Sequence, residues 1–292
     1  ITTPNVDVNF HNGGLVGAAY NIGNMVDGTT GSLVINDKPV WPVVAEVNGE
    51  YFATFAEAVK KIATDGTDTT IKLLNDIELT ESIDFQYGTG KIIFTADKPV
   101  TVKQTKLGLD LGFTIGNDTP IVIDENVTFE IYDNASGMYI YYGPSLNVKG
   151  AIVGGQNWGC LYLFYGDHVV AETGKIGVGR VQSGFNTVTV YGEVDTNYLL
   201  IEGGKFIADG AVIDAVNVHD SNNGGMRWGA STFTIKNGST VNAGTVTLGY
   251  AESVLSIDAT SKLTAKTIKG AGKIIIDATG MTAGEVATIT GD

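Results

Sequence analysis

Short apolar segments separated by turn residues run along the chain from Thr70 onward. The clearest of these segments are Ile71–Leu74, Ile92–Phe94, Ile121–Ile123, Leu146–Val148, Val188–Val190 and Leu199–Ile201. Gly, Asn or Asp residues punctuate the intervals between them. Apolar segments of this length, bounded by these turn residues, predict short β-strands rather than helices.

The C-terminal third contains an internal repeat. Three apolar triplets recur at steps of about twenty residues, namely Phe233–Ile235, Leu255–Ile257 and Ile274–Ile276. Between them, Ser239–Val246 matches Ser261–Ile268 with an offset of 22. A period in the twenties with two or three strands per unit predicts a solenoid of β-coils. A β-sandwich is the competing interpretation, but it needs antiparallel hairpins, and the chain has few Asn-Gly or Asp-Gly turns between alternating strands.

One segment, Thr54–Thr64, has the pattern of an amphipathic helix. Thr54 and Glu57 form a capping box, and Gly66 supplies a stop. The apolar stripe consists of Phe55, Ala58, Val59, Ile62 and Ala63. Because a helix of this length is marginal alone, its stripe must cover other apolar groups. We therefore expect it to cap the open end of the solenoid, where strand edges and core would otherwise be exposed.

These patterns divide the chain into two parts. Residues 1–45, rich in Gly and Asn, are expected to form an N-terminal lead-in with short strands. Residues 46–292 are expected to form the β-helix, with the cap helix at 54–64 and coils from about 70 to 290. The predicted fold class is thus all-β.

Composition excludes several classes of function. The net charge is −14, and only Arg180 and Arg227 are arginines, so nucleic acid and anionic polysaccharide are not expected as partners. The single Cys160 cannot form an intrachain disulfide, and no Cys or His spacing predicts a metal site or a cofactor. The chain has no apolar span of 18 residues, so membrane insertion is not expected. It begins at Ile1 without a signal peptide, as a processed or excised piece would.

The start of the predicted solenoid resembles a known family. The segments are Val47–Tyr51 (VNGEY), Thr54–Val59 (TFAEAV) and Thr70–Ile77 (TIKLLNDI). They resemble the opening of right-handed parallel β-helix (pectin-lyase-like) modules in large cell-surface proteins of gut Firmicutes and related bacteria. The close match spans residues 47–77, and the remainder agrees only in strand rhythm.

That resemblance implies a right-handed β-helix solenoid with an N-terminal capping α-helix, secreted to the bacterial cell surface. The segments Lys273–Ala278 and Gly284–Val286 look like the last coil of such modules, after which another domain commonly begins. Further domains of the same parent chain are therefore expected as neighbours.

Aromatic residues are concentrated between residues 138 and 198. Tyr-Gly recurs at Tyr142, Tyr165 and Tyr191, with spacings of 23 and 26, and Trp158 lies among them. If these spacings are coils, the three rings stack about 4.8 Å apart in one outward column, a platform for sugar faces. The alternative is that aromatic rings of this region fill the core. If Val188 and Val190 point inward, alternation places Tyr139, Tyr141, Tyr162 and Phe164 inward as well.

A polar segment at residues 217–228 is the second candidate. The four side chains in it that could orient a ligand are His219, Asp220, Arg227 and Trp228. Loops that project from a rigid coil commonly carry binding groups. An Asx-type turn with a solvated His is the alternative interpretation.

Catalysis is not the expected function, although pectin-lyase-like folds include lyases and glycosidases. Neither arginine lies in a motif resembling the lyase motif of that family, and the carboxylate and His set of polygalacturonases is missing. Possible glycosidase carboxylates are Asp195, Asp209, Asp214 and Asp220, but their spacing selects no pair. We expect a non-catalytic surface module that binds neutral glycan or a host-surface protein. A structural stalk or spacer is the alternative, and a glycan-active lyase or glycosidase is the third.

Overall fold

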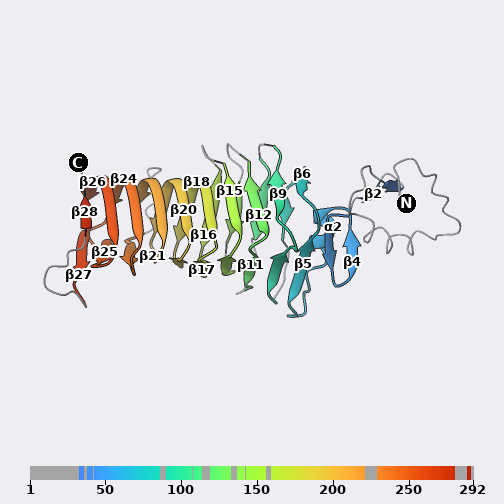
Figure 1. Cartoon of the computed structure of the whole chain (residues 1–292), viewed down its shortest axis with the longest axis horizontal. Helices are drawn as coiled ribbons and strands as arrows, with labels where there is room; N and C mark the ends of the chain where they lie inside the picture. The colour runs from blue at the N-terminus through green and yellow to red at the C-terminus, as the bar shows by residue number, and fades with distance from the viewer. Residues whose placement is uncertain are drawn as a thin grey trace.

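The chain folds into an elongated parallel β-solenoid (Figure 1). The computed structural model describes residues 33–35, 38–41, 43–85, 90–106, 108–113, 119–132, 137–141, 143–155, 159–220, 229–279 and 288–290. Coils stack along the long axis from β5 (Thr69–Leu73) to β27 (Lys273–Asp277) and β28 (Thr288–Thr290). The all-β, parallel β-helix class predicted from the sequence is confirmed.

Three parallel sheets form the wall of the solenoid. After β5, the first sheet contains β8 (Ile92–Thr95), β11 (Ile121–Ile123), β14 (Leu146–Val148), β17 (Asp167–Val170), β19 (Thr187–Val190), β21 (Lys205–Asp209), β23 (Thr232–Lys236), β25 (Val254–Asp258) and β27. The second contains β6 (Ile77–Leu79), β9 (Val100–Gln104), β12 (Val127–Ile131), β15 (Ala151–Gly154), β18 (Lys175–Gly184), β20 (Glu193–Glu202), β22 (Val212–His219), β24 (Thr240–Leu248), β26 (Lys262–Gly270) and β28. The third contains β7 (Ile83–Asp84), β10 (Asp110–Phe113), β13 (Gly137–Ile140) and β16 (Cys160–Phe164).

The second and third sheets merge at β18. Its first half pairs with β15, and its second half, from Arg180, pairs with β16. Gly179 lies between the two halves and pairs with neither strand. From this coil onward, one long strand replaces two short ones.

The core is a set of inward columns that continue from coil to coil. One column consists of Ile71, Phe94, Ile123, Val148, Val170, Val190, Ala208, Ile235, Ile257 and Ile276. Its members before Ile276 are buried. The step between them ranges from 18 residues (Val190 to Ala208) to 29 residues (Phe94 to Ile123). Length therefore varies in the turns while the strands keep their register.

The repeat read from the C-terminal third is confirmed. Thr240 pairs with Lys262, which is the offset of 22 found in the sequence. Phe233 pairs with Leu255, which in turn pairs with Ile274.

A hairpin and a helix cover the N-terminal end of the core. The strands β3 (Ala45–Val47) and β4 (Glu50–Phe52) pair antiparallel, and β3 also pairs antiparallel with β5. Asn48 and Gly49 both have positive φ, as a two-residue hairpin turn requires. Separately, β1 (Leu33–Ile35) and β2 (Lys38–Trp41) form a two-stranded antiparallel sheet.

The helix α2 (Phe55–Val59) is shorter than the predicted 54–64. Thr54 is its N-cap, accepting a hydrogen bond from the Glu57 N–H, and the stripe residues Phe55, Ala58, Val59 and Ile62 are buried. The following N–H groups bond to carbonyls three residues back, from Lys61 to Ala58 and from Ile62 to Val59. Since the Ala63 N–H bonds to Thr69 Oγ1 at 2.9 Å, the helical pattern ends there.

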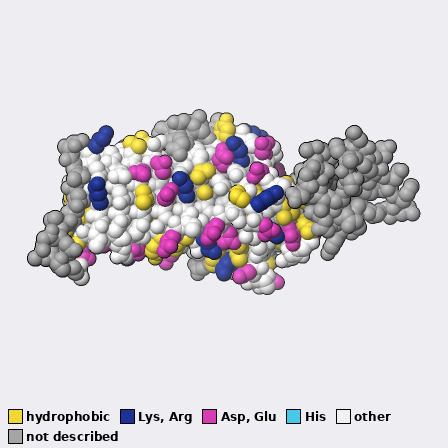
Figure 2. Space-filling view, viewed as in Figure 1, with side chains coloured by type: hydrophobic (Ala, Val, Ile, Leu, Met, Phe, Trp, Pro, Cys, Tyr) yellow, Lys and Arg dark blue, Asp and Glu magenta, His cyan; other side chains and the backbone are white. Residues whose placement is uncertain are grey.

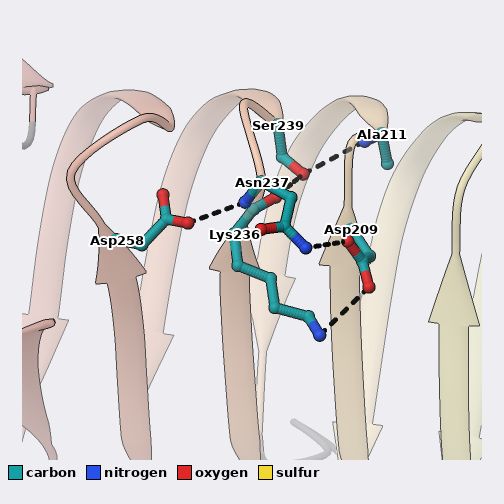
Figure 3. A network of polar contacts seen from close by, with 6 residues as sticks. All are labelled: Asp209, Ala211, Lys236, Asn237, Ser239 and Asp258. Carbon is teal, nitrogen blue, oxygen red and sulfur yellow. Dashed lines mark hydrogen bonds and ion pairs between the residues drawn. The ribbon is translucent and has the colours of Figure 1, made fainter. Parts of the chain in front are cut away.

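Polar ladders tie the turns of neighbouring coils together (Figure 3). Asn237 donates from Nδ2 to Asp209 Oδ1 at 2.6 Å, and its N–H donates to Asp258 Oδ2 at 2.7 Å. The buried hydroxyl of Ser239 accepts from the Ala211 N–H at 3.0 Å. These bonds satisfy turn backbone groups that the strands cannot pair.

Candidate functional site

A groove lies at the corner where the chain leaves the third wall of the solenoid and enters the first sheet. It has a volume of about 610 Å³. Its walls are Gly143, Ser145, Gly166, Asp167, Phe185, Asn186, Thr187, Gly203, Gly204, Lys205, Ala230 and Thr232. Many of these residues are Gly or Ala, so backbone and short side chains leave the groove open.

Two stacked aromatic rings stand at this corner. Tyr165 stacks on Phe185 with centroids 5.7 Å apart and planes inclined by 16°. Tyr165 is 44% exposed and Phe185 is 38% exposed. Both have a positive φ, 62° and 52°, which is uncommon for bulky residues and frequent at functional positions. The backbone therefore holds two large rings outward beside the groove.

A polar column runs along one wall of the groove. Successive coils place Ser145, Asp167, Thr187, Lys205 and Thr232 in register. Neighbouring strands lie about 4.8 Å apart, so the column extends roughly 19 Å along the solenoid axis. Its single carboxylate and single ammonium cancel in charge.

Asn186 adds a buried polar group to the groove. Its side chain is held by a hydrogen bond from Nδ2 to the carbonyl oxygen of Leu163 at 2.8 Å. Its Oδ1 is buried and accepts no hydrogen bond.

The predicted column of three Tyr-Gly rings is wrong. Tyr165 lies at the groove corner, whereas Tyr191 follows β19 and donates its N–H to the Val170 carbonyl, at the corner between the first and second sheets. Tyr191 is 40% exposed, so both rings face outward as predicted, but on different corners. The spacing of 26 is not a coil step, because the register there advances by 20 residues (Val170 to Val190). Tyr142 and Trp158 lie outside the described residues.

The side-chain alternation predicted for the aromatic strands is also wrong. Met138 and Leu161 fill the core, while their neighbours Tyr139 and Tyr162 lie on the outer face and stack at 4.7 Å with planes 5° apart. Burial, as the largest cause, raises the pKa of both tyrosines. They form a half-buried outer ladder rather than core.

The His219 and Asp220 side chains diverge. His219 lies on the outer wall and stacks on Tyr198 at 6.4 Å, and burial lowers its pKa. Asp220 is buried and accepts hydrogen bonds from the N–H groups of Gly249 and Tyr250. Its carboxylate thus satisfies a turn of the next coil. Arg227 and Trp228 lie outside the described residues.

The carboxylates considered for glycosidase chemistry do not converge on the groove. Asp195 and Asp214 are exposed and pair in register on the second sheet. For Asp209, burial raises the pKa, but hydrogen bonds from Asn237 and Lys236 outweigh it and lower the pKa, opposite to what a general acid requires. Burial raises the pKa of Glu202, although its hydrogen bond with Gln182 opposes this, but Glu202 is fully buried where substrate cannot reach it.

Within the described part of the chain, no three His, Cys, Asp or Glu side chains are placed to hold a metal ion. None of the helices in those residues is long and apolar enough to span a membrane.

Phe185 and Asn186 are the groove residues that sequence reasoning missed. The signal was present, because Thr187–Val190 aligns with Asp167–Val170 in register. That alignment places Phe185 after Tyr165 and Asn186 after Gly166. Tyr-Gly spacing drew attention to a different residue, Tyr191.

No protein-family model, no curated protein and no solved structure matches this chain.

Proposed function

We propose that this chain is a non-catalytic binding module for neutral glycans and that the corner groove is its binding site. The observation that carries the proposal is the exposed stack of Tyr165 on Phe185 beside an open groove. Large exposed aromatic surface is costly unless it serves an interaction, and the flat faces of sugar rings fit aromatic faces.

The polar groups of the groove suit hydroxyl-rich ligands. Ser145, Thr187 and Thr232 supply hydroxyls that both donate and accept hydrogen bonds. Asp167 and Lys205 balance in charge, and Figure 2 shows basic and acidic side chains interspersed over the visible face. Recognition of an anionic polymer needs clustered cations, and this arrangement supplies none along the groove.

The shape of the groove favours an extended chain. Its polar column crosses five coils along the solenoid axis, from Ser145 to Thr232. A chain of several sugar units lying along this axis would meet a new side chain at each coil. A single sugar would leave most of the column without contact.

The wider setting follows from the resemblance at residues 47–77. We propose that the module belongs to the pectin-lyase-like β-helix modules of bacterial cell-surface proteins, that it is secreted, and that further domains of a parent chain flank it. The adhesin role, with neutral glycan as its ligand, is part of the same proposal. A structural stalk is the second candidate, favoured by the long, regular stack of coils.

A neutral-glycan array tests the proposal. The wild-type chain is expected to bind at least one glycan class. A variant with Tyr165→Ala and Phe185→Ala is expected to bind at least about tenfold more weakly, because it loses the stacking area. The matched control is Tyr191→Ala, which removes a similarly exposed tyrosine from another corner.

Three results would contradict the proposal. Wild-type protein that binds no glycan would favour the stalk. Equal loss of binding in the Tyr191→Ala control would move the site to the other corner. Turnover of a polysaccharide that is lost in Asp195→Asn or Asp214→Asn would make the chain an enzyme.

A further inference from the structure

The groove contains a buried hydrogen-bond acceptor without a donor. Asn186 is only 8% exposed, and it lies directly after Phe185 of the exposed stack. No residue that the structure describes donates to its Oδ1. Buried polar atoms nearly always have a partner, so an orphan atom on the wall of a groove calls for an explanation.

The orientation of this amide is fixed by chemistry. Its other end faces the backbone carbonyl oxygen of Leu163 at 2.8 Å, and a carbonyl oxygen can only accept. The NH₂ group must therefore lie on the Leu163 side. Consequently the atom left over is an oxygen, which can accept a hydrogen bond but cannot donate one.

The neighbouring coil leaves room beside this oxygen. A Cβ added at Gly204 would lie 3.2 Å from Oδ1 and 2.8 Å from the backbone oxygen of Asn186. Gly204 itself lines the groove, as does Asn186. The absence of a side chain at Gly204 thus keeps this part of the wall uncovered.

We infer that Asn186 Oδ1 accepts a hydrogen bond from a free hydroxyl of the bound glycan, and that this bond makes the groove selective against O-methylated glycans. The inference rests on the proposed function of the groove. A hydroxyl donates its hydrogen to Oδ1, whereas a methyl ether at the same place has no hydrogen to donate. The ether would leave the buried acceptor unsatisfied and add bulk against Gly204, so a site of this kind discriminates by the missing donor.

The test is an array that carries each neutral oligosaccharide in two forms, with free hydroxyls and fully O-methylated. Wild-type protein is expected to bind the methylated form of its best glycan at least about tenfold more weakly than the free form. Asn186→Leu, which has a similar volume and no polar atom, is expected to bind the free form more weakly and to lose most of the discrimination. The matched control is Thr189→Val, on the same strand but outside the groove lining, and it is expected to discriminate as the wild type does.

The outcomes separate the two proposals. If wild-type protein binds free and methylated forms equally, the role of Asn186 is wrong while glycan binding stands. If Asn186→Leu folds and still discriminates like the wild type, the role of Asn186 is again wrong. If no glycan binds, the proposed function fails and the inference fails with it. Should Asn186→Leu not fold, as judged by circular dichroism, the comparison of the two forms on wild-type protein still decides.

Discussion

The buried imidazole of His168 donates a hydrogen bond from Nε2 to the backbone carbonyl oxygen of Tyr165, with 2.8 Å between the two atoms. Its Nδ1 accepts a hydrogen bond from the Leu146 N–H at 3.2 Å. Because Nδ1 must accept, the proton of the neutral ring sits on Nε2. One neutral imidazole therefore fixes the backbone of the exposed aromatic stack to the preceding coil.

This arrangement predicts that acid destabilises the fold through His168. Burial is the largest cause that lowers the pKa of His168, from 6.5 to about 4. The unfolded chain takes up a proton below pH 6.5 while the folded chain does not, so stability present above pH 6.5 is lost as the pH falls toward 4. The shift corresponds to roughly 3 kcal/mol of unfolding free energy.

Denaturant unfolding at pH 7, 5.5 and 4 measures this effect. His168→Gln cannot titrate, so its deficit relative to the wild type is expected to be largest at pH 7 and to shrink toward pH 4. The half-buried His219, whose pKa is also lowered, is present in both proteins, and its contribution cancels. A deficit that stays constant across this pH range would contradict the assigned role.

The cap predicts a second stability effect. Phe55 of α2 is buried and packs against Phe85 and Phe94, with ring centroids 6.1 Å away in each case. Phe55→Ala is expected to cost about 3–5 kcal/mol, because it leaves a cavity at the end of the core. Hydrogen exchange is expected to accelerate most in β5 and β8, the first strands beneath the cap. Lys60→Ala, an exposed change at the end of the same helix, is the control, and an equal loss of stability there would contradict the explanation.

Gly192 predicts a third effect, which concerns the Tyr-Gly motif itself. A Cβ at Gly192 would lie 2.2 Å from the Gly174 carbonyl oxygen and 2.4 Å from that of Ala171. Gly192→Ala is therefore expected to lose at least about 1–3 kcal/mol of unfolding free energy. At Gly177 the nearest atom to an added Cβ is 3.6 Å away, so Gly177→Ala is the matched control and is expected to be tolerated. Thermal unfolding measures both variants.

The strand register was predictable because it follows from repeated apolar positions. Phe233, Leu255 and Ile274 occupy the same place in successive coils, and each is apolar because the core requires it. The cap helix was predictable from Thr54 and its stripe for the same reason. Its end was not, since the side chain that takes the Ala63 N–H, Thr69, belongs to the next strand.

The aromatic strands were not predictable because their sequence lacks alternation. Residues 138–142 read MYIYY, and residues 161–164 read LYLF, so both faces of each strand are apolar and either phase fills the core equally well. The structure places the aliphatic side chains, Met138 and Leu161, inside and leaves Tyr139 and Tyr162 outside. The Tyr-Gly spacing misled for a different reason. Gly166 and Gly192 each serve a tight corner, and a coil has more than one corner.

The axial groove predicts that affinity depends on the length of the glycan chain. The polar column from Ser145 to Thr232 spans roughly 19 Å, so affinity is expected to rise with each added sugar unit until the chain fills it and then to level off. Calorimetric titration with a length series of the best array glycan measures this. Thr232→Val, at the end of the column, is expected to weaken binding of long chains and leave short chains unaffected if they sit nearer the aromatic stack. Because the ligand is neutral, affinity is expected to change little between low and high salt. Affinity that is full with a single sugar, or that falls steeply with salt, would contradict an extended neutral chain in this groove.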